Sequence, residues 1–187
     1  MKPAEPVSSI VASVVTGESI VLGTVSLPTT NLPSAAGPAT YHFRFLELLN
    51  NPRLASVQKG VIRESLPLTD VCILPRNGPR IPVAQELLVR PESIVCAYEY
   101  EGQAQEVQYD PGLYHRPERV VIITVNGLRL EGTFLGGVSV LAAPKQKRFL
   151  PLVDATLSQT DDVGTRLLVP FIAVNNDAIA AFTQGSA

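Results

Sequence analysis

Residues that carry chemistry are scarce in this sequence. Its 187 residues include two histidines and two cysteines. No two His, Cys or acidic residues fall at a metal-ligand spacing such as CxxC or HxxxH. An enzyme would need a pocket that gathers Asp70, Asp154 or His42, and no partner base accompanies the carboxylates. We therefore expect no enzyme, and no catalytic, cofactor-binding or metal site.

Charge and long apolar runs are also in short supply. Charged residues make up 17% of the chain and the formal net charge is −2, so no global positive field attracts nucleic acid. No segment approaches the ~20 apolar residues that span a bilayer, and the first residues lack a signal-peptide core. We expect a cytoplasmic protein. Its 45% hydrophobic content is enough for a packed core.

Turn-forming residues, in contrast, are plentiful. Sixteen prolines and thirteen glycines divide the chain into short apolar runs, a pattern typical of an all-β protein with many turns. Cys72 and Cys96 both fall in such strand-like runs. Buried free thiols are the favoured interpretation, and a disulfide between them stays open.

The second part of the chain repeats the first. Leu-Pro-Leu-Thr-Asp at 66–70 recurs as Leu-Pro-Leu-Val-Asp at 150–154, and the apolar block 87–95 recurs at 172–180. Gly-Thr at 23–24 likewise corresponds to Gly-Thr at 132–133. Three matches in the same order indicate a tandem duplication.

Each repeat is expected to contain five strands. The predicted strands are 10–15, 19–27, 65–74, 81–89 and 93–100 in the first unit, and 120–125, 128–135, 149–157, 166–174 and 178–183 in the second. Asn126-Gly127 is a strong hairpin signal, because both residues tolerate a positive φ. Closing five short strands into a small barrel would remove exposed sheet edges. The predicted fold is thus all-β, with two tandem five-stranded barrels.

The division of the chain follows from this pattern. Residues 1–100 form the first unit, 101–117 a polar linker and 118–187 the second unit. An insertion at 28–60 in the first unit turns helical over Tyr41–Asn50, where Phe45, Leu48 and Leu49 share one face. The insertion is either a docking arm or a lid over the first barrel.

The pattern of strands and turns resembles the Sm-like fold, a small barrel of the SH3-like kind. Gly132 is similar to the glycine that lets the second strand of that family bend, and 150–155 is similar to the end of its first motif. Residues 172–179, an apolar strand, a small polar turn and another apolar strand, resemble its second motif. The blocks FLPLVDATL and FIAVNNDAI also resemble an uncharacterised bacterial family of Sm-like domains of unknown function.

The resemblance implies an RNA site that this sequence lacks in its usual form. RNA-binding Sm proteins place an asparagine where this chain has Phe149 or Ser65. A local basic cluster, Lys145, Lys147 and Arg148, is a candidate anion or nucleic-acid contact, although a solvated loop is the favoured interpretation. An RNA- or other nucleic-acid-binding protein is therefore the alternative function.

The favoured function is a non-enzymatic scaffold or protein-interaction module. The resemblance implies that the fourth and fifth strands offer edges to a neighbour. The candidate interface residues on those edges are Leu87, Val89, Leu167, Val169 and Phe171. Unprotected apolar edges are templates for another chain, so we expect a homo-oligomer or a complex with another protein.

Overall fold

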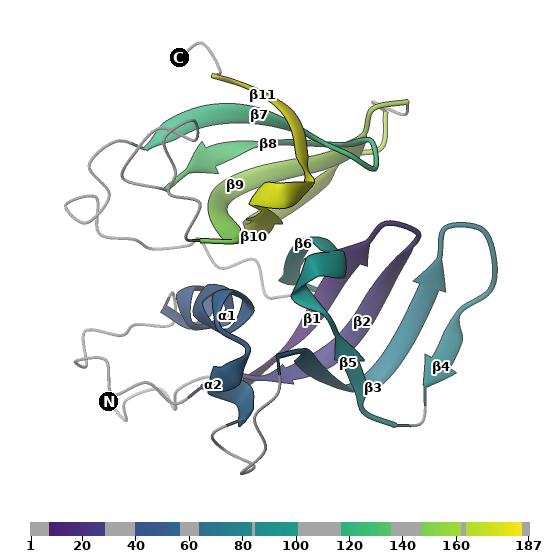
Figure 1. The fold of residues 1–187 in the computed structure, drawn as a ribbon. Helices are drawn as coiled ribbons and strands as arrows, with labels where there is room; N and C mark the ends of the chain where they lie inside the picture. Colours follow the sequence, from purple (N-terminus) through teal and green to yellow (C-terminus); the bar gives the residue numbers. More distant parts are fainter. Residues whose placement is uncertain are drawn as a thin grey trace, which may run out of the picture.

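The computed structural model describes residues 8–28, 40–56, 64–83, 85–100, 117–135, 147–161 and 164–184 as a mostly β protein. Eleven antiparallel strands form one sheet in the order β11-β7-β8-β9-β10-β6-β1-β2-β3-β4, and β5 pairs with β3 beside β4. Figure 1 shows the strands as two stacked groups, β1–β6 below and β7–β11 above. We call these groups the first and second halves.

The predicted strands match the observed ones closely. The first half contains β1 (Ser9–Thr16), β2 (Ser19–Ser26), β3 (Leu66–Pro75), β4 (Ile81–Val83), β5 (Leu87–Val89) and β6 (Ile94–Glu99). The second half contains β7 (Glu118–Thr124), β8 (Leu128–Phe134), β9 (Phe149–Gln159), β10 (Leu167–Asn175) and β11 (Ile179–Gln184). The difference lies in the strand predicted at 81–89, which the structure divides into β4 and β5.

Short helical segments complete the described chain. They are α1 (Thr40–Asn50), α2 (Arg53–Ser56) and the 3-10 turns η1 (Pro91–Ser93) and η3 (Asn176–Ala178). The predicted helix at 41–50 is confirmed, and its apolar face at Phe45, Leu48 and Leu49 is buried. The predicted linker lies outside the described residues except for Pro117.

The two halves bend at corresponding places. Asp70 in β3 and Asp154 in β9 have φ values of 52° and 49°, which non-glycine residues seldom adopt. Opposite them, the β2–β3 register shifts at Gly23 and the β8–β9 register shifts at Gly132. Each site is a β-bulge, which adds a residue to one strand and bends it sharply.

A Cβ in place of either glycine at these two bulges would be crowded. A Cβ on Gly23 would lie 2.9 Å from the Leu68 Cβ, and one on Gly132 would lie 3.1 Å from the Val153 carbonyl oxygen. The bent-strand interpretation of Gly132 therefore has a packing cause. Closure into barrels stays a prediction, because among the described strands no pairing joins β5 to β6 or β10 to β11.

The two hydrophobic cores share strands. The core that holds α1 includes Phe149, Phe171 and Ala173 of the second half. The other core includes Cys96 and Tyr98 of the first half. Each half therefore completes the core of the other. Cys72 and Cys96 are both free thiols and do not form a disulfide.

We expect Gly23→Ala and Gly132→Ala each to lower the free energy of unfolding by about 1–3 kcal/mol, because the added methyl group must displace packed atoms. Gly17, in the β1–β2 turn, is the matched control, since a Cβ there would meet nothing within 4 Å. Gly17→Ala should change stability by no more than about 0.5 kcal/mol. Urea unfolding of the three variants measures this, and equal effects would contradict the bulge argument.

Candidate functional site

The junction between the two halves is a strand pairing. β10, the predicted fourth strand of the second half, lies antiparallel to β6, the predicted fifth strand of the first half, since β4 and β5 together take the place of one predicted strand. The paired residues are Ile172 with Tyr98, Ala173 with Ala97 and Val174 with Cys96, and all six are buried. The sheet therefore continues without a break from one half to the other.

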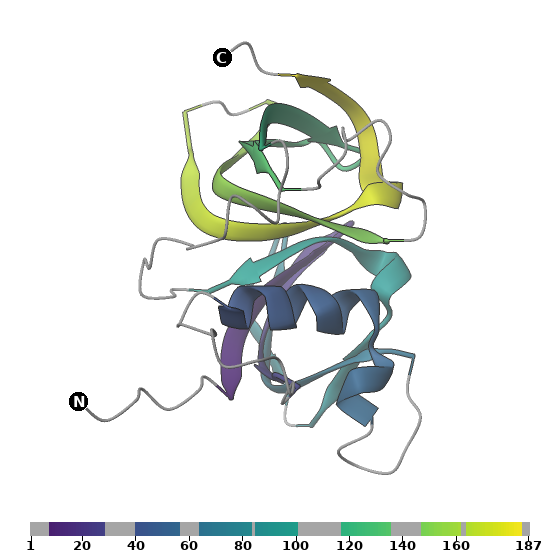
Figure 2. The ribbon, with the colours of Figure 1, turned by 90° about the vertical axis from the view of Figure 1, so that its left-hand side faces the viewer.

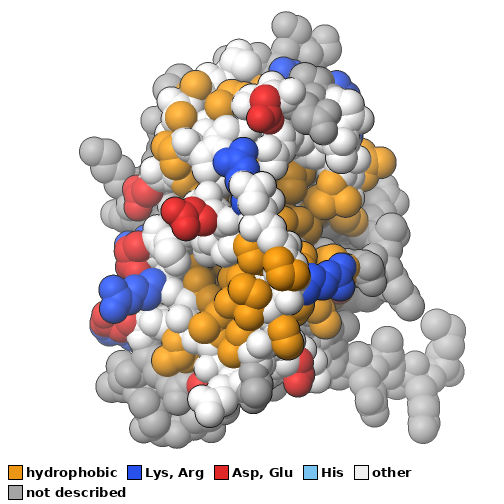
Figure 3. All heavy atoms as spheres, turned by 90° about the vertical axis from the view of Figure 1, so that its right-hand side faces the viewer, with side chains coloured by type: hydrophobic (Ala, Val, Ile, Leu, Met, Phe, Trp, Pro, Cys, Tyr) orange, Lys and Arg blue, Asp and Glu red, His pale blue; other side chains and the backbone are white. Residues whose placement is uncertain are grey.

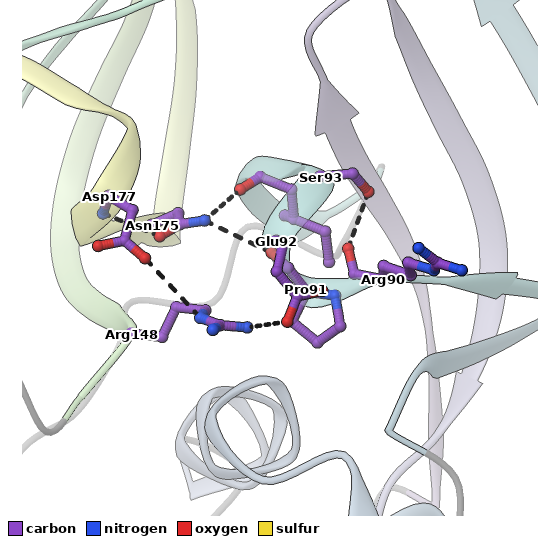
Figure 4. A network of polar contacts seen from close by, with 8 residues as sticks. Arg90, Pro91, Glu92, Ser93, Arg148, Asn175 and Asp177 are labelled. Carbon is purple, nitrogen blue, oxygen red and sulfur yellow. Dashed lines mark hydrogen bonds and ion pairs between the residues drawn. The ribbon is translucent and has the colours of Figure 1, made fainter.

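The turns that follow the fourth strands reinforce this pairing. Asn175, which ends β10, donates from Nδ2 to the carbonyl oxygens of Ile94 at 2.7 Å and Pro91 at 3.4 Å. Its Oδ1 accepts the backbone N–H of Asp177, which forms η3. Figure 4 shows this carboxamide directed from η3 onto η1. One buried side chain thus holds both turns.

An arginine joins the acidic side chains of the same two turns. Arg148 contacts Glu92 of η1 at 2.7 Å and Asp177 of η3 at 4.0 Å (Figure 4). Glu92 also accepts a backbone hydrogen bond, and together with Arg148 this keeps the pKa of its carboxyl below the usual value. Because both carboxylates are exposed and Arg148 is half-buried, these ion pairs add little stability.

Helix α1 lies in front of the first half and runs alongside the junction in the view of Figure 2. The Asn50 carboxamide pairs with the backbone of Phe149, donating to its carbonyl oxygen at 3.1 Å and accepting its N–H at 2.9 Å. The carboxamide thereby satisfies the N–H and C=O groups at the start of β9, as a neighbouring strand would. The helix from the insertion is therefore a fixed part of the junction.

A polar cluster joins the start of α1 to β6. The Tyr41 hydroxyl donates to Glu99 at 2.6 Å, and Nε2 of buried His42 lies 3.2 Å from the same carboxylate. The His42 ring stacks on Phe171 of β10, with ring centroids 5.2 Å apart. Burial disfavours the charged carboxylate, but the hydrogen bonds from His42 and Tyr41 outweigh it, so the pKa of Glu99 lies below its usual value.

The candidate catalytic residues His42, Asp70 and Asp154 do not lie in one pocket. His42 contacts Glu99, whereas Asp70 and Asp154 lie exposed at the two bulges. Two hollows of about 270 Å³ and 230 Å³ lie along the junction, and none of these three residues lines either one. Among the described residues there is also no group of three or more His, Cys, Asp or Glu side chains that could hold a metal ion.

The predicted interface residues have mixed positions. The side chains of Val169 and Phe171 are buried in the interior, so a partner at this edge would pair with backbone groups, and their place in an interface stays a prediction. Leu167, 46% exposed, lies on β10 beyond the stretch that pairs with β6. Leu87 is half-buried and Val89 is buried, both on β5.

The outer edges of the sheet remain without a strand neighbour among the described residues. One edge is formed by β4 and β5, and the other is formed by β11. On the first edge Ile81 and Leu88 are 48% and 46% exposed. Figure 3 shows hydrophobic side chains gathered on the face of the first half where β3 and β4 lie.

The predicted basic cluster is described only in part, and its role as an anion contact stays a prediction. Lys145 lies outside the described residues, Lys147 is exposed, and Arg148 is committed to Glu92 and Asp177. The sequence did not indicate Asn50 or Asn175 as junction residues, because their partners are distant backbone groups. A polar residue at the end of a predicted helix or strand was their only signal.

Comparison with known proteins gives one limited similarity. The structure of the Pyrococcus abyssii Sm protein in complex with a uridine heptamer is similar to this chain, with 21% identity over 42% of this chain and 100% of that chain, and a TM-score of 0.28. No family model and no curated protein matches, so the resemblance to a bacterial Sm-like family stays a prediction. No helix in the described ranges is long and apolar enough to cross a membrane.

We expect Glu99→Gln to destabilise the protein by about 1–2 kcal/mol at neutral pH, because two hydrogen bonds lose a charged acceptor. A carboxylate with a lowered folded pKa stabilises the fold above its unfolded pKa, and this contribution is lost as pH falls through the folded pKa. The difference between wild type and variant should therefore shrink below about pH 4.

Thermal melts at several pH values measure this difference. Glu64→Gln is the control, since Glu64 forms an exposed pair with Arg53 and its loss should cost no more than about 0.5 kcal/mol. A Glu99→Gln effect that is independent of pH would contradict the charged-acceptor argument.

Proposed function

We propose that this protein is a non-enzymatic scaffold of two Sm-like five-stranded units that assembles with copies of itself through strand edges. The observation that carries the proposal is the β10–β6 junction, where a fourth strand already pairs with a fifth strand. The same two kinds of strand form the outer edges, with β5 at one end and β11 at the other.

The outer edges correspond to the paired ones residue by residue. Leu87–Val89 of β5 matches 172–174 of β10 at a separation of 85 residues. β6 and β11 share a register irregularity, since Val95 and Ala180 are each skipped in the pairing with the neighbouring first strand. A β5–β11 contact between chains would thus repeat the β10–β6 contact within the chain.

Such a contact is head-to-tail, because each chain uses a different edge at each end. Head-to-tail contacts generate rings if the rotation closes and filaments if it does not. The backbone groups of the edges supply the hydrogen bonds, and exposed apolar side chains such as Leu88 supply buried area.

RNA binding is the competing candidate, and the site favours it less. Phe149, at the position of the missing asparagine, is fully buried, and Arg148 is held by acidic side chains. The formal net charge of −2 adds no long-range attraction for a phosphate backbone.

We expect light scattering on the purified chain at tens of micromolar to give a multiple of the 20.1 kDa chain mass. Leu88→Lys should weaken each contact at least tenfold, equivalent to about 1.4 kcal/mol, because it places a charge in the β5 edge. The fold should survive this change, since the Leu88 side chain is 46% exposed.

Leu168→Lys is the matched control. Leu168 is 79% exposed on the end of β10 beyond the β6 pairing, so the assembly should persist in this variant. If Leu168→Lys dissolves the assembly and Leu88→Lys does not, the β10 end is the interface instead. A wild-type mass of one chain would contradict self-assembly.

For nucleic acid, titration with oligo(U) and oligo(A) at physiological salt should show no sub-micromolar affinity, because few cations are available to displace counterions. Fluorescence anisotropy measures this directly. A tight complex that prefers one of the two sequences would reverse the ranking of the two functions.

A further inference from the structure

The residue before η1, Arg90, has a counterpart in the junction between the halves. Arg90 stands 85 residues before Asn175. Arg90 directly follows β5, Asn175 is the last residue of β10, and each immediately precedes a 3-10 turn. Their backbones agree, with φ and ψ of −74° and 130° for Arg90 and −71° and 120° for Asn175. The two side chains therefore leave equivalent positions in the two halves.

Their surroundings differ because one position is inside the molecule and the other is at its end. Asn175 is buried and donates to Pro91 and Ile94 carbonyl oxygens of the first half. Arg90 is exposed, and Figure 4 shows its side chain directed away from this network. Arg90 thus presents a hydrogen-bond donor at the free end of the sheet. At the equivalent position inside the molecule, the donor of Asn175 joins the two halves.

We propose that Arg90 binds the η3 turn of a second copy of this chain, donating to the Asn176 carbonyl oxygen and to the Asp177 carboxylate. This contact rests on the proposed self-assembly. In it, Arg90 would select β11 of another copy as the strand that pairs with β5. Asn176 stands 85 residues after Pro91, so its carbonyl is the equivalent of one that Asn175 binds.

The charges beside the 3-10 turns explain why an arginine suits position 90. In the internal junction the acid of the turn, Glu92, is met by Arg148 at 2.7 Å. The residue equivalent to Arg148 in the first half, 84 positions earlier, is Glu64. In a chain–chain contact Glu64, which pairs with Arg53 at 2.8 Å, would face Asp177 of the next copy, and two carboxylates brought together oppose association.

Arg90 supplies the cation that Glu64 cannot. A guanidinium is charged, has only donors and can bind a carbonyl and a carboxylate oxygen together, whereas the carboxamide of Asn175 is neutral, shorter and carries an acceptor beside its donors. Asp177 is exposed, and Arg148, its ion-pair partner among the described residues, lies at the long distance of 4.0 Å. The η3 turn therefore offers an acid and a carbonyl to a neighbour.

The occupant of the edge is a second copy because the complement is present in the same chain. The η3 turn leads directly into β11, as η1 leads into β6. A neighbour that pairs β11 with β5 would bring its η3 turn to Arg90, just as the β10–β6 pairing brings η1 to Asn175.

Charge reversal tests the contact. Arg90→Glu and Asp177→Arg each place like charges together and should each weaken assembly at least tenfold in a light-scattering concentration series. The double variant restores an opposite pair at every head-to-tail contact, and its assembly should return to within about threefold of wild type. Rescue of this kind would not follow from a merely structural role of either residue.

Arg76→Glu is the matched control. Arg76 is an exposed arginine just after Pro75, at the end of β3 that lies away from β5. It should leave assembly unchanged. Thermal melts identify any variant that unfolds, and Asp177→Asn serves as the milder substitute for Asp177→Arg, with weakened assembly again expected.

The outcomes separate this inference from the proposed function. If wild type is monomeric, self-assembly itself is wrong. If wild type assembles and Leu88→Lys dissolves the assembly, but neither reversal matters or the double variant is as weak as the single ones, only the role of Arg90 is overturned.

Discussion

The pairing of β10 with β6 is the interaction on which the rest of the structure depends. Successive residues of a strand point to opposite faces of a sheet, so two central strands serve two cores at once. Phe171 and Ala173 enter the core that contains α1, while Ile172 and Val174 enter the other. Neither half has a complete core without the strand that the other contributes.

Backbone polar groups around this pairing form hydrogen bonds with side chains that are far away in the sequence. Asn50 takes the place of a neighbouring strand beside Phe149, and Asn175 takes the place of a capping group on η1. An unpaired backbone group buried in a protein is costly, so a shifted register would leave these groups without partners. The carboxamides therefore specify how the halves fit together, beyond what apolar packing requires.

The scarcity of reactive residues is consistent with a protein whose interactions come from its backbone. The described sheet ends in strands that lack a strand neighbour on one side, and their side chains are largely apolar. Sheet edges recruit partners through N–H and C=O groups that every residue carries. In the proposed self-assembly, specificity would come from the few charged groups at the strand ends, such as Arg90 and Asp177.

Local patterns in the sequence determined much of this structure. The Asn126-Gly127 turn and the apolar face of α1 follow from the conformational freedom of glycine and from helical spacing, which act within a few residues. Only the tertiary structure decided that β10 lies against β6, that Val169 and Phe171 are buried, and that Arg148 is engaged by Glu92. These features join segments far apart in the chain, and an apolar strand has the same sequence pattern whether its edge is free or already paired.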